Sequence, residues 1–231
     1  MGVLLMLMTI GGLIAAIVLL IAALVTKTKW LRNFVLSGVV VWFAFYAVML
    51  FGFSLTSAET VLVAGQPKEY CGFYLDCHMH TVVTGVRTAT NIGGVAAKGI
   101  YYIANVKVFS DARNANVALR LIAPKARVVL ANGEKIKRDE AAETKLPTAN
   151  VRLDSDIHNN ETIEKEIVFD LPPGAADPKL LVTEGYGIDK TIECVLVDDE
   201  DSIFHAKTFF DLSESPALAG GQTVAVPSRD R

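Results

Sequence analysis

One short segment, Glu69–Val83, concentrates residue types that could do chemistry, because it holds two of the three cysteines and two of the four histidines. If this segment is a strand, alternate side chains share a face, so Asp76, His78 and His80 point the same way. Such neighbours lie roughly 6–7 Å apart and combine carboxylate with imidazole, which are ligands that suit copper or zinc. The pattern predicts a partial metal site, with the missing ligands coming from among His158, His205 and Cys194.

The alternative interpretation of the same segment is structural. Cys77 and Met79 would fill the core while the histidines lie on a solvated face or a contact surface. In an oxidising compartment Cys71 and Cys77 can also form a disulfide. On one strand their Cα atoms would be about 20 Å apart, beyond the limit of roughly 7 Å, so the bond requires a turn near Gly72. The sequence slightly favours this pair over Cys77–Cys194, and either pairing leaves one thiol free.

No motif in the sequence supports an enzyme. The spacing C-x5-C-H around Cys71 and Cys77 differs from the C-x-x-C-H of covalent haem attachment. No G-x-S-x-G, P-loop or dinucleotide fingerprint occurs, and the acidic run 198–201 lacks the glycine and spacing of a calcium loop. We therefore expect no catalytic residue, no bound organic cofactor, and no metal other than copper or zinc.

Two uncharged runs at the start of the chain, 3–25 and 33–53, predict a transmembrane hairpin. At 1.5 Å per residue, a helix over either run reaches about 30 Å, enough to cross the hydrocarbon core of a bilayer. Lys27, Lys29 and Arg32 are the only charges in this region, and the positive-inside rule places their loop in the cytoplasm. We expect a multi-pass protein of the inner or cytoplasmic membrane, with its N-terminus and its C-terminal domain on the periplasmic or extracellular side.

Small residues spaced four apart form a helix-packing pattern on the first span, at Gly11 and Ala15 and again at Gly12 and Ala16. Such a face lets two helix backbones approach closely, which matters in lipid because no hydrophobic effect drives helices together. The face would pack either on the second helix of the hairpin or on a helix of another membrane protein.

Beyond the spans, the sequence predicts a linker at 54–69, an all-β domain at 70–212, and a flexible or partner-bound tail at 213–231. Alternating apolar residues separated by Asn-Gly, Pro-Pro-Gly and Asp-Pro turn signals indicate an antiparallel sandwich. The polar stretch 137–160 is expected to be a surface loop. The candidate strands are 73–84, 100–110, 116–122, 126–131, 163–170, 179–184, 190–197 and 203–210.

Part of this domain resembles a known family. The stretch GIYYIANVKVF, a strand ending in NGE, and the pattern E-x-x-x-x-F-D-L-P-P-G resemble the telokin-like, immunoglobulin-like family of unknown function. That family occurs on bacterial membrane-anchored and exported proteins, and the similarity covers roughly residues 99–184. The resemblance implies a non-catalytic immunoglobulin-like sandwich used for contacts, with no family site residues to transfer.

The function expected from these features is that of a non-catalytic, membrane-anchored accessory, assembly or scaffold subunit of a larger membrane complex. All 25 acidic side chains lie after the hairpin, so the exported part is acidic and nucleic acid is excluded as a partner. The expected partners are the lipid bilayer and other integral membrane subunits. The alternatives are a copper- or zinc-binding module and a ligand-sensing or adhesion domain, the latter requiring a concave apolar pocket.

Overall fold

The computed structural model describes residues 2–71, 77–114 and 116–213, and it divides the chain into two compact units. The first unit combines the chain up to Glu59 with Gly187–Lys207, and the second combines Thr60–Tyr186 with the chain from Thr208 onward. The sequence predicted a single domain over 70–212. The structure differs, because Gly187–Lys207 leaves the β domain and joins the helices.

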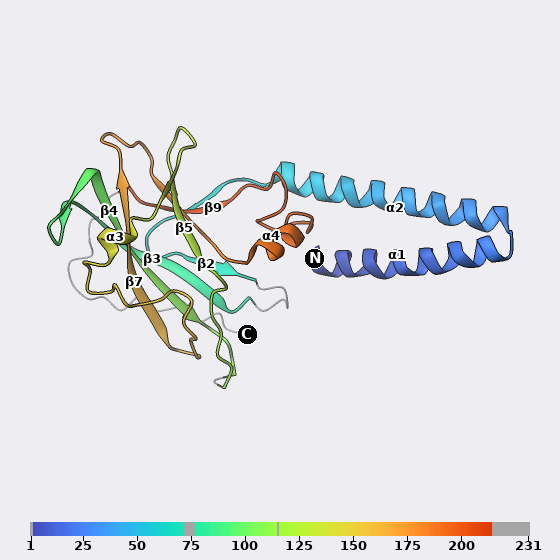
Figure 1. Cartoon of the computed structure of the whole chain (residues 1–231), viewed down its shortest axis with the longest axis horizontal. Coiled ribbons are helices and arrows are strands. Elements are labelled where there is room, and N and C mark those ends of the chain that lie inside the picture. The colour runs from blue at the N-terminus through green and yellow to red at the C-terminus, as the bar shows by residue number, and fades with distance from the viewer. Residues whose placement is uncertain (1, 72–76, 115, 214–231) are drawn as a thin grey trace. The chain divides into compact units, whose positions relative to one another are not determined.

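The first unit contains the two predicted long helices, α1 (Gly2–Val25) and α2 (Lys29–Thr56), joined by a short polar turn (Figure 1). Among the described residues these are the two helices long and apolar enough to cross a membrane, as the sequence predicted. Each helix runs slightly beyond the uncharged run that predicted it. A third, short helix, α4 (Gly187–Glu193), belongs to the same unit.

The α1–α2 contact follows a seven-residue repeat. Trp42 Nε1 donates a hydrogen bond to Thr9 Oγ1 across the two helices at 3.0 Å. The repeat explains the pairing, because residues spaced 3.5 apart on average stay on one stripe of a gently supercoiled helix. The partly or fully buried α1 residues on this stripe are Gly2, Met6, Thr9, Leu13, Ala16, Leu20 and Ala23.

The second unit is a β-sandwich of two sheets. The five-stranded sheet has the order β1-β9-β8-β5-β6 and the four-stranded sheet the order β2-β3-β4-β7. All neighbours are antiparallel except β1 and β9, which are parallel. The first sheet comprises β1 (Thr60–Leu62), β9 (Thr208–Asp211), β8 (Lys179–Thr183), β5 (Lys125–Val129) and β6 (Lys135–Lys137). The second comprises β2 (Pro67–Tyr70), β3 (Met79–Ile92), β4 (Val95–Ser110) and β7 (Thr162–Leu171).

The core lies between these sheets and is built by alternate residues of the long strands. In β7, Ile167, Phe169 and Leu171 are fully buried in this core. Phe210 of β9 and Leu180 of β8 are fully buried in the same core. The β-sandwich that the alternation predicted is therefore confirmed, with one parallel strand pair that the sequence did not predict.

Several predicted segments differ from the structure, and the strand predicted at 203–210 begins only at Thr208. The linker 54–69 contains β1 and β2, strands too short for their alternation to be recognised. The predicted strand 116–122 is reduced to a single bridge between Leu119 and Ile157. The predicted strand at 190–197 is instead the end of α4 and the turn after it, since a short apolar run does not distinguish helix from strand.

The polar stretch 137–160 is more than the surface loop that the sequence predicted. It carries α3 (Glu140–Glu143), capped by Asp139, whose side chain accepts a hydrogen bond from the Ala142 N–H at 2.9 Å. Ala142 and Leu146 pack against Ile103 and its neighbours on the face of the four-stranded sheet that lies away from the main core. The stretch therefore covers that face and closes a second, smaller core.

Candidate functional site

The chemistry-bearing segment lies at one end of the β2–β3 hairpin. Tyr70 and Met79 are the last register partners of the two strands. Cys71 directly follows Tyr70, and Cys77 lies two residues before Met79. The structure joins these cysteines in a disulfide with a Cα–Cα distance of 4.0 Å, the pairing that the sequence favours. The sequence placed Cys77 inside a strand at 73–84, but the strand begins at Met79, which leaves both cysteines in the connection.

The two histidines of this segment meet an aspartate from the end of the neighbouring strand. Asp111 Oδ1 lies 2.8 Å from His78 Nδ1 and 3.3 Å from His80 Nε2. The pairing of Met79 with Ser110 in the β3–β4 register brings Asp111 beside both rings. His80 is buried and stacks on Phe109, with ring centroids 4.9 Å apart, while His78 and Asp111 are exposed.

The electrostatics of this cluster favour an ionised carboxylate. Burial by itself raises the pKa of Asp111, but the hydrogen bond from His78 and the nearby imidazole of His80 outweigh it, and the pKa lies below its ordinary value. One carboxylate oxygen lies near both imidazoles, and His78 is the one that forms a hydrogen bond with it in the described structure, while His80 Nε2 is buried without a hydrogen bond. The cluster thus fixes the start of β3 to the end of β4.

The predicted metal site gains no support from the described residues. Asp76 lies outside them, and within them no group of three or more His, Cys, Asp or Glu is placed to hold a metal ion. His78 and His80 instead contact Asp111 directly.

The residues proposed as further ligands are engaged elsewhere. His158 Nδ1 pairs with Glu161 Oε2 at 3.2 Å in the sandwich. Cys194 and His205 belong to the helical unit, where Cys194 Sγ donates to Thr191 O and His205 Nδ1 contacts Ala206 O. Cys194 is the free cysteine, as the favoured pairing requires.

An open cleft of about 980 Å³ lies in the sandwich. One wall is formed by β5 and β6, and the other by residues near the start of β4 and the end of β7. Its lining is largely charged, so it is not the concave apolar pocket that a ligand-sensing domain requires. Arg127 and Lys137 are exposed register partners within it, which places two cations opposite each other across β5 and β6. Like charges in this position repel each other and weaken the strand pair.

The predicted helix-packing residues divide between two faces of α1. Ala16 lies on the seam with α2, whereas Gly11, Gly12 and Ala15 are exposed. In the described structure, a Cβ placed on Gly11 or Gly12 would meet nothing within 4 Å. Most of the small-residue face is therefore not used by the hairpin itself.

Comparisons with known proteins leave the family of this chain open. No protein-family model and no curated protein matches it. Among solved structures, a secreted protein of Mycobacterium tuberculosis, MPT63, is similar with a TM-score of 0.43 and 11% identity, over 68% of this chain and 99% of that one. An uncharacterized β-sandwich protein of Clostridium difficile 630 is similar with a TM-score of 0.35 and 10% identity, over 68% of this chain and 96% of that one.

Proposed function

We propose that this protein is a non-catalytic, membrane-anchored accessory or assembly subunit of a larger membrane protein complex. Its hairpin docks in the bilayer against another subunit, and its exported sandwich contacts partners outside. The loop with Lys27, Lys29 and Arg32 faces the cytoplasm, as the positive-inside rule favours. A respiratory or photosynthetic complex as the host is an analogy of layout.

The uncovered small-residue face of α1 is the observation that carries this proposal. Gly11 and Ala15 lie one turn apart on the outside of the hairpin, with open space above Gly11. A backbone at such a face can approach another helix closely and gain van der Waals contact over several turns. Lipid chains fill the same space less well, so a partner helix is the occupant that these residues favour.

We also infer that the exported unit is an immunoglobulin-like sandwich of the telokin-like type. The two-sheet arrangement and the strand pairing of β4 with β7, which contain the resembling motifs, support this assignment. The charged cleft is the contact surface that we assign to a partner, since an acidic group placed between Arg127 and Lys137 would relieve their repulsion.

The test is to fill the small-residue face and follow the partners. In Gly11→Leu and Ala15→Leu variants, the bulky side chains separate the helices, and we expect the co-purifying membrane proteins to be lost after mild extraction. The matched control is Ile14→Leu, which changes the shape of an exposed apolar residue on the same helix without adding volume. If the Gly11→Leu and Ala15→Leu variants retain the same partners as the Ile14→Leu control, the proposal is wrong.

A further inference from the structure

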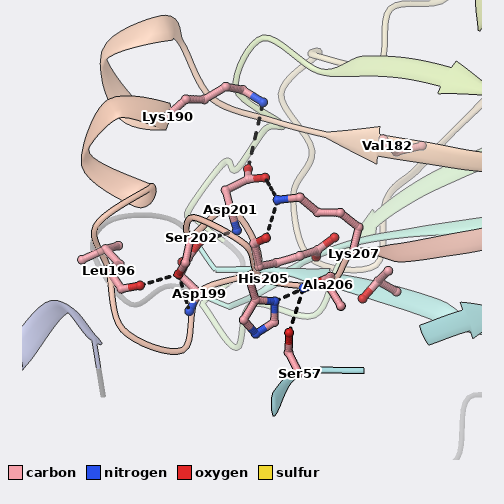
Figure 2. Close-up of polar contacts among 12 residues, drawn as sticks. Ser57, Val182, Lys190, Leu196, Asp199, Asp201, Ser202, His205, Ala206 and Lys207 are labelled. Carbon is pink, nitrogen blue, oxygen red and sulfur yellow. Dashed lines mark hydrogen bonds and ion pairs between the residues drawn. The ribbon is translucent and has the colours of Figure 1, made fainter. Parts of the chain in front are cut away.

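The segment Gly187–Lys207 lies between β8 and β9 in the sequence but belongs to the unit of the two long helices. Figure 2 shows its polar contacts, including the one between Ala206 and Ser57. Tyr46 Oη donates a hydrogen bond to Val195 O at 2.6 Å, and the Ala206 N–H donates to Ser57 Oγ at 2.8 Å. The rings of Phe51 and Phe204 also meet, with centroids 6.2 Å apart. Three separate contacts therefore hold the segment against the second half of α2.

The segment also meets the first residue of α1. A Cβ on Gly2 would lie 2.3 Å from Val197 O, so only glycine permits this approach of the two backbones. Leu196 and Val197 are buried there. The segment thus packs against the N-terminal end of α1 as well as against α2.

These contacts place the segment at bilayer depth. Tyr46 and Phe51 lie within the uncharged run 33–53, which the sequence assigns to the membrane. Tyr46 precedes the end of α2 at Thr56 by about 15 Å along the helix axis, at 1.5 Å per residue. Whatever packs against this part of α2 therefore reaches the boundary between headgroups and acyl chains, on the side opposite Lys29 and Arg32.

Four large apolar side chains of the segment are exposed, beside the exposed Thr191 and Asp198. Ile188 is 72% exposed and Phe204 is 67% exposed, and Val195 and Ile203 are exposed as well. Phe204 joins this apolar surface to α2, because its ring meets that of Phe51, which is itself exposed. Apolar side chains beside a membrane span are stabilised when they enter the interface.

Backbone and hydroxyl groups of the segment pair with one another, as backbone at this depth requires. Among the described residues, Glu193 Oε2 is the atom of this segment that is buried without a hydrogen-bond partner. The Ile203 N–H donates to Cys194 O at 3.0 Å, and Ser202 Oγ donates to Leu196 O. Asp201 lies between two lysines, 2.5 Å from Lys207 Nζ and 4.0 Å from Lys190 Nζ (Figure 2). The acidic turn is thereby partly neutralised by the segment's own cations.

We propose that Gly187–Lys207 is a membrane-interface segment, whose exposed apolar side chains insert among the lipids of the outer leaflet. The inference rests on the membrane placement of α1 and α2 in the proposed function, but it needs no partner protein. The occupant of the apolar surface is lipid, because that surface is continuous with the lipid-facing side of α2. A depth of roughly 5–10 Å is typical for such segments.

The test uses the full chain in phosphatidylcholine liposomes. In a Cys194→Ser background, which retains the Cys71–Cys77 disulfide, single cysteines are introduced by Ile188→Cys and Phe204→Cys and labelled with an environment-sensitive fluorophore. Lipids carrying a nitroxide either near the headgroup or near the chain end then report depth by quenching. The controls are Val40→Cys, exposed on α2 within the span, and Thr90→Cys, exposed on β3 of the sandwich.

We expect labels at positions 188 and 204 to lose more fluorescence to the shallow nitroxide than to the deep one. The label at position 40 should show the reverse order, and the label at position 90 should lose little to either. If positions 188 and 204 behave like position 90 while position 40 is quenched, the interface proposal is wrong and the membrane anchor stands. If position 40 also escapes quenching, both fail.

Discussion

At the scale of single residues, Glu193 has the most strongly shifted pKa among the described residues outside the two long helices. Burial, followed by the nearby charges of Asp201 and Asp199, raises the pKa of Glu193 from 4.5 to about 7. Within the described residues its Oε2 atom is buried without a hydrogen-bond partner. A raised carboxyl pKa means that the folded state holds the proton more tightly than the unfolded state, so stability falls as pH rises from about 4.5 through about 7.

Glu193→Gln should therefore stabilise the protein at pH 8 and change it little at pH 5, because glutamine resembles the protonated acid. The measurement is the thermal unfolding midpoint in detergent at both pH values. The control is Glu164→Gln, at an exposed position on β7, for which we expect no pH-dependent difference. An equal change at both pH values in the Glu193 variant would contradict this account of the carboxyl group.

The histidine cluster shows what residue patterns can and cannot predict. Strand alternation predicted that His78 and His80 share a face, and the structure places both beside one carboxylate. That carboxylate belongs to Asp111, whereas the predicted Asp76 lies outside the described residues. It reaches the histidines only through the β3–β4 register, which pairs Met79 with Ser110. Register depends on the whole hairpin, so Asp111 was not predictable from the segment alone.

At the scale of elements, a buried ion pair fixes the stretch 137–160 over the four-stranded sheet. Glu143 is 5% exposed, receives a hydrogen bond from Arg138 Nε at 2.9 Å, and accepts the Val168 N–H of β7 at 3.1 Å. Lys165, also buried, donates to Val151 O at 2.7 Å, and burial lowers the pKa of this lysine. These hydrogen bonds attach the polar stretch 137–160 to β7. The composition of the stretch does not predict this attachment.

Glu143→Ala should lower the free energy of unfolding by about 2–3 kcal/mol, because it leaves the partly buried Arg138 and the buried Val168 N–H without their acceptor. Chemical denaturation followed by circular dichroism measures this loss. As a control, Glu161→Ala removes an exposed acid that pairs with His158, and should cost about 0–1 kcal/mol. A loss in the Glu143 variant as small as that of the control would show that the loop does not depend on this pair.

The elements also differ in how well the sequence predicted them. Long uncharged runs predicted α1 and α2, because an apolar stretch of this length without charges is typical of a membrane-spanning helix. Clear alternation predicted β4 and β7. The short strands β1 and β2 and the seven-residue helix α4 escaped prediction, since their formation depends on pairing and packing with distant residues rather than on local pattern.

At the scale of the whole molecule, the chain combines a β-sandwich with two helices that are long and apolar enough to cross a membrane. The segment Gly187–Lys207 leaves that sandwich to pack on the helices. The division into units was not predictable from local pattern, because the segment is held by contacts with α2 and with the residue after it that lie 149 positions away in the sequence. The proposed role follows from surfaces rather than from chemistry: an open small-residue face on α1, and a charged cleft in the sandwich.

The measurement that tests this role most directly is the particle mass of the native protein after mild detergent extraction, with the co-migrating proteins identified. An accessory subunit should migrate in a defined assembly much larger than its own 25.0 kDa, together with integral membrane proteins in fixed proportion. A lone 25.0 kDa chain, or a simple homo-oligomer without other proteins, would contradict the proposed function.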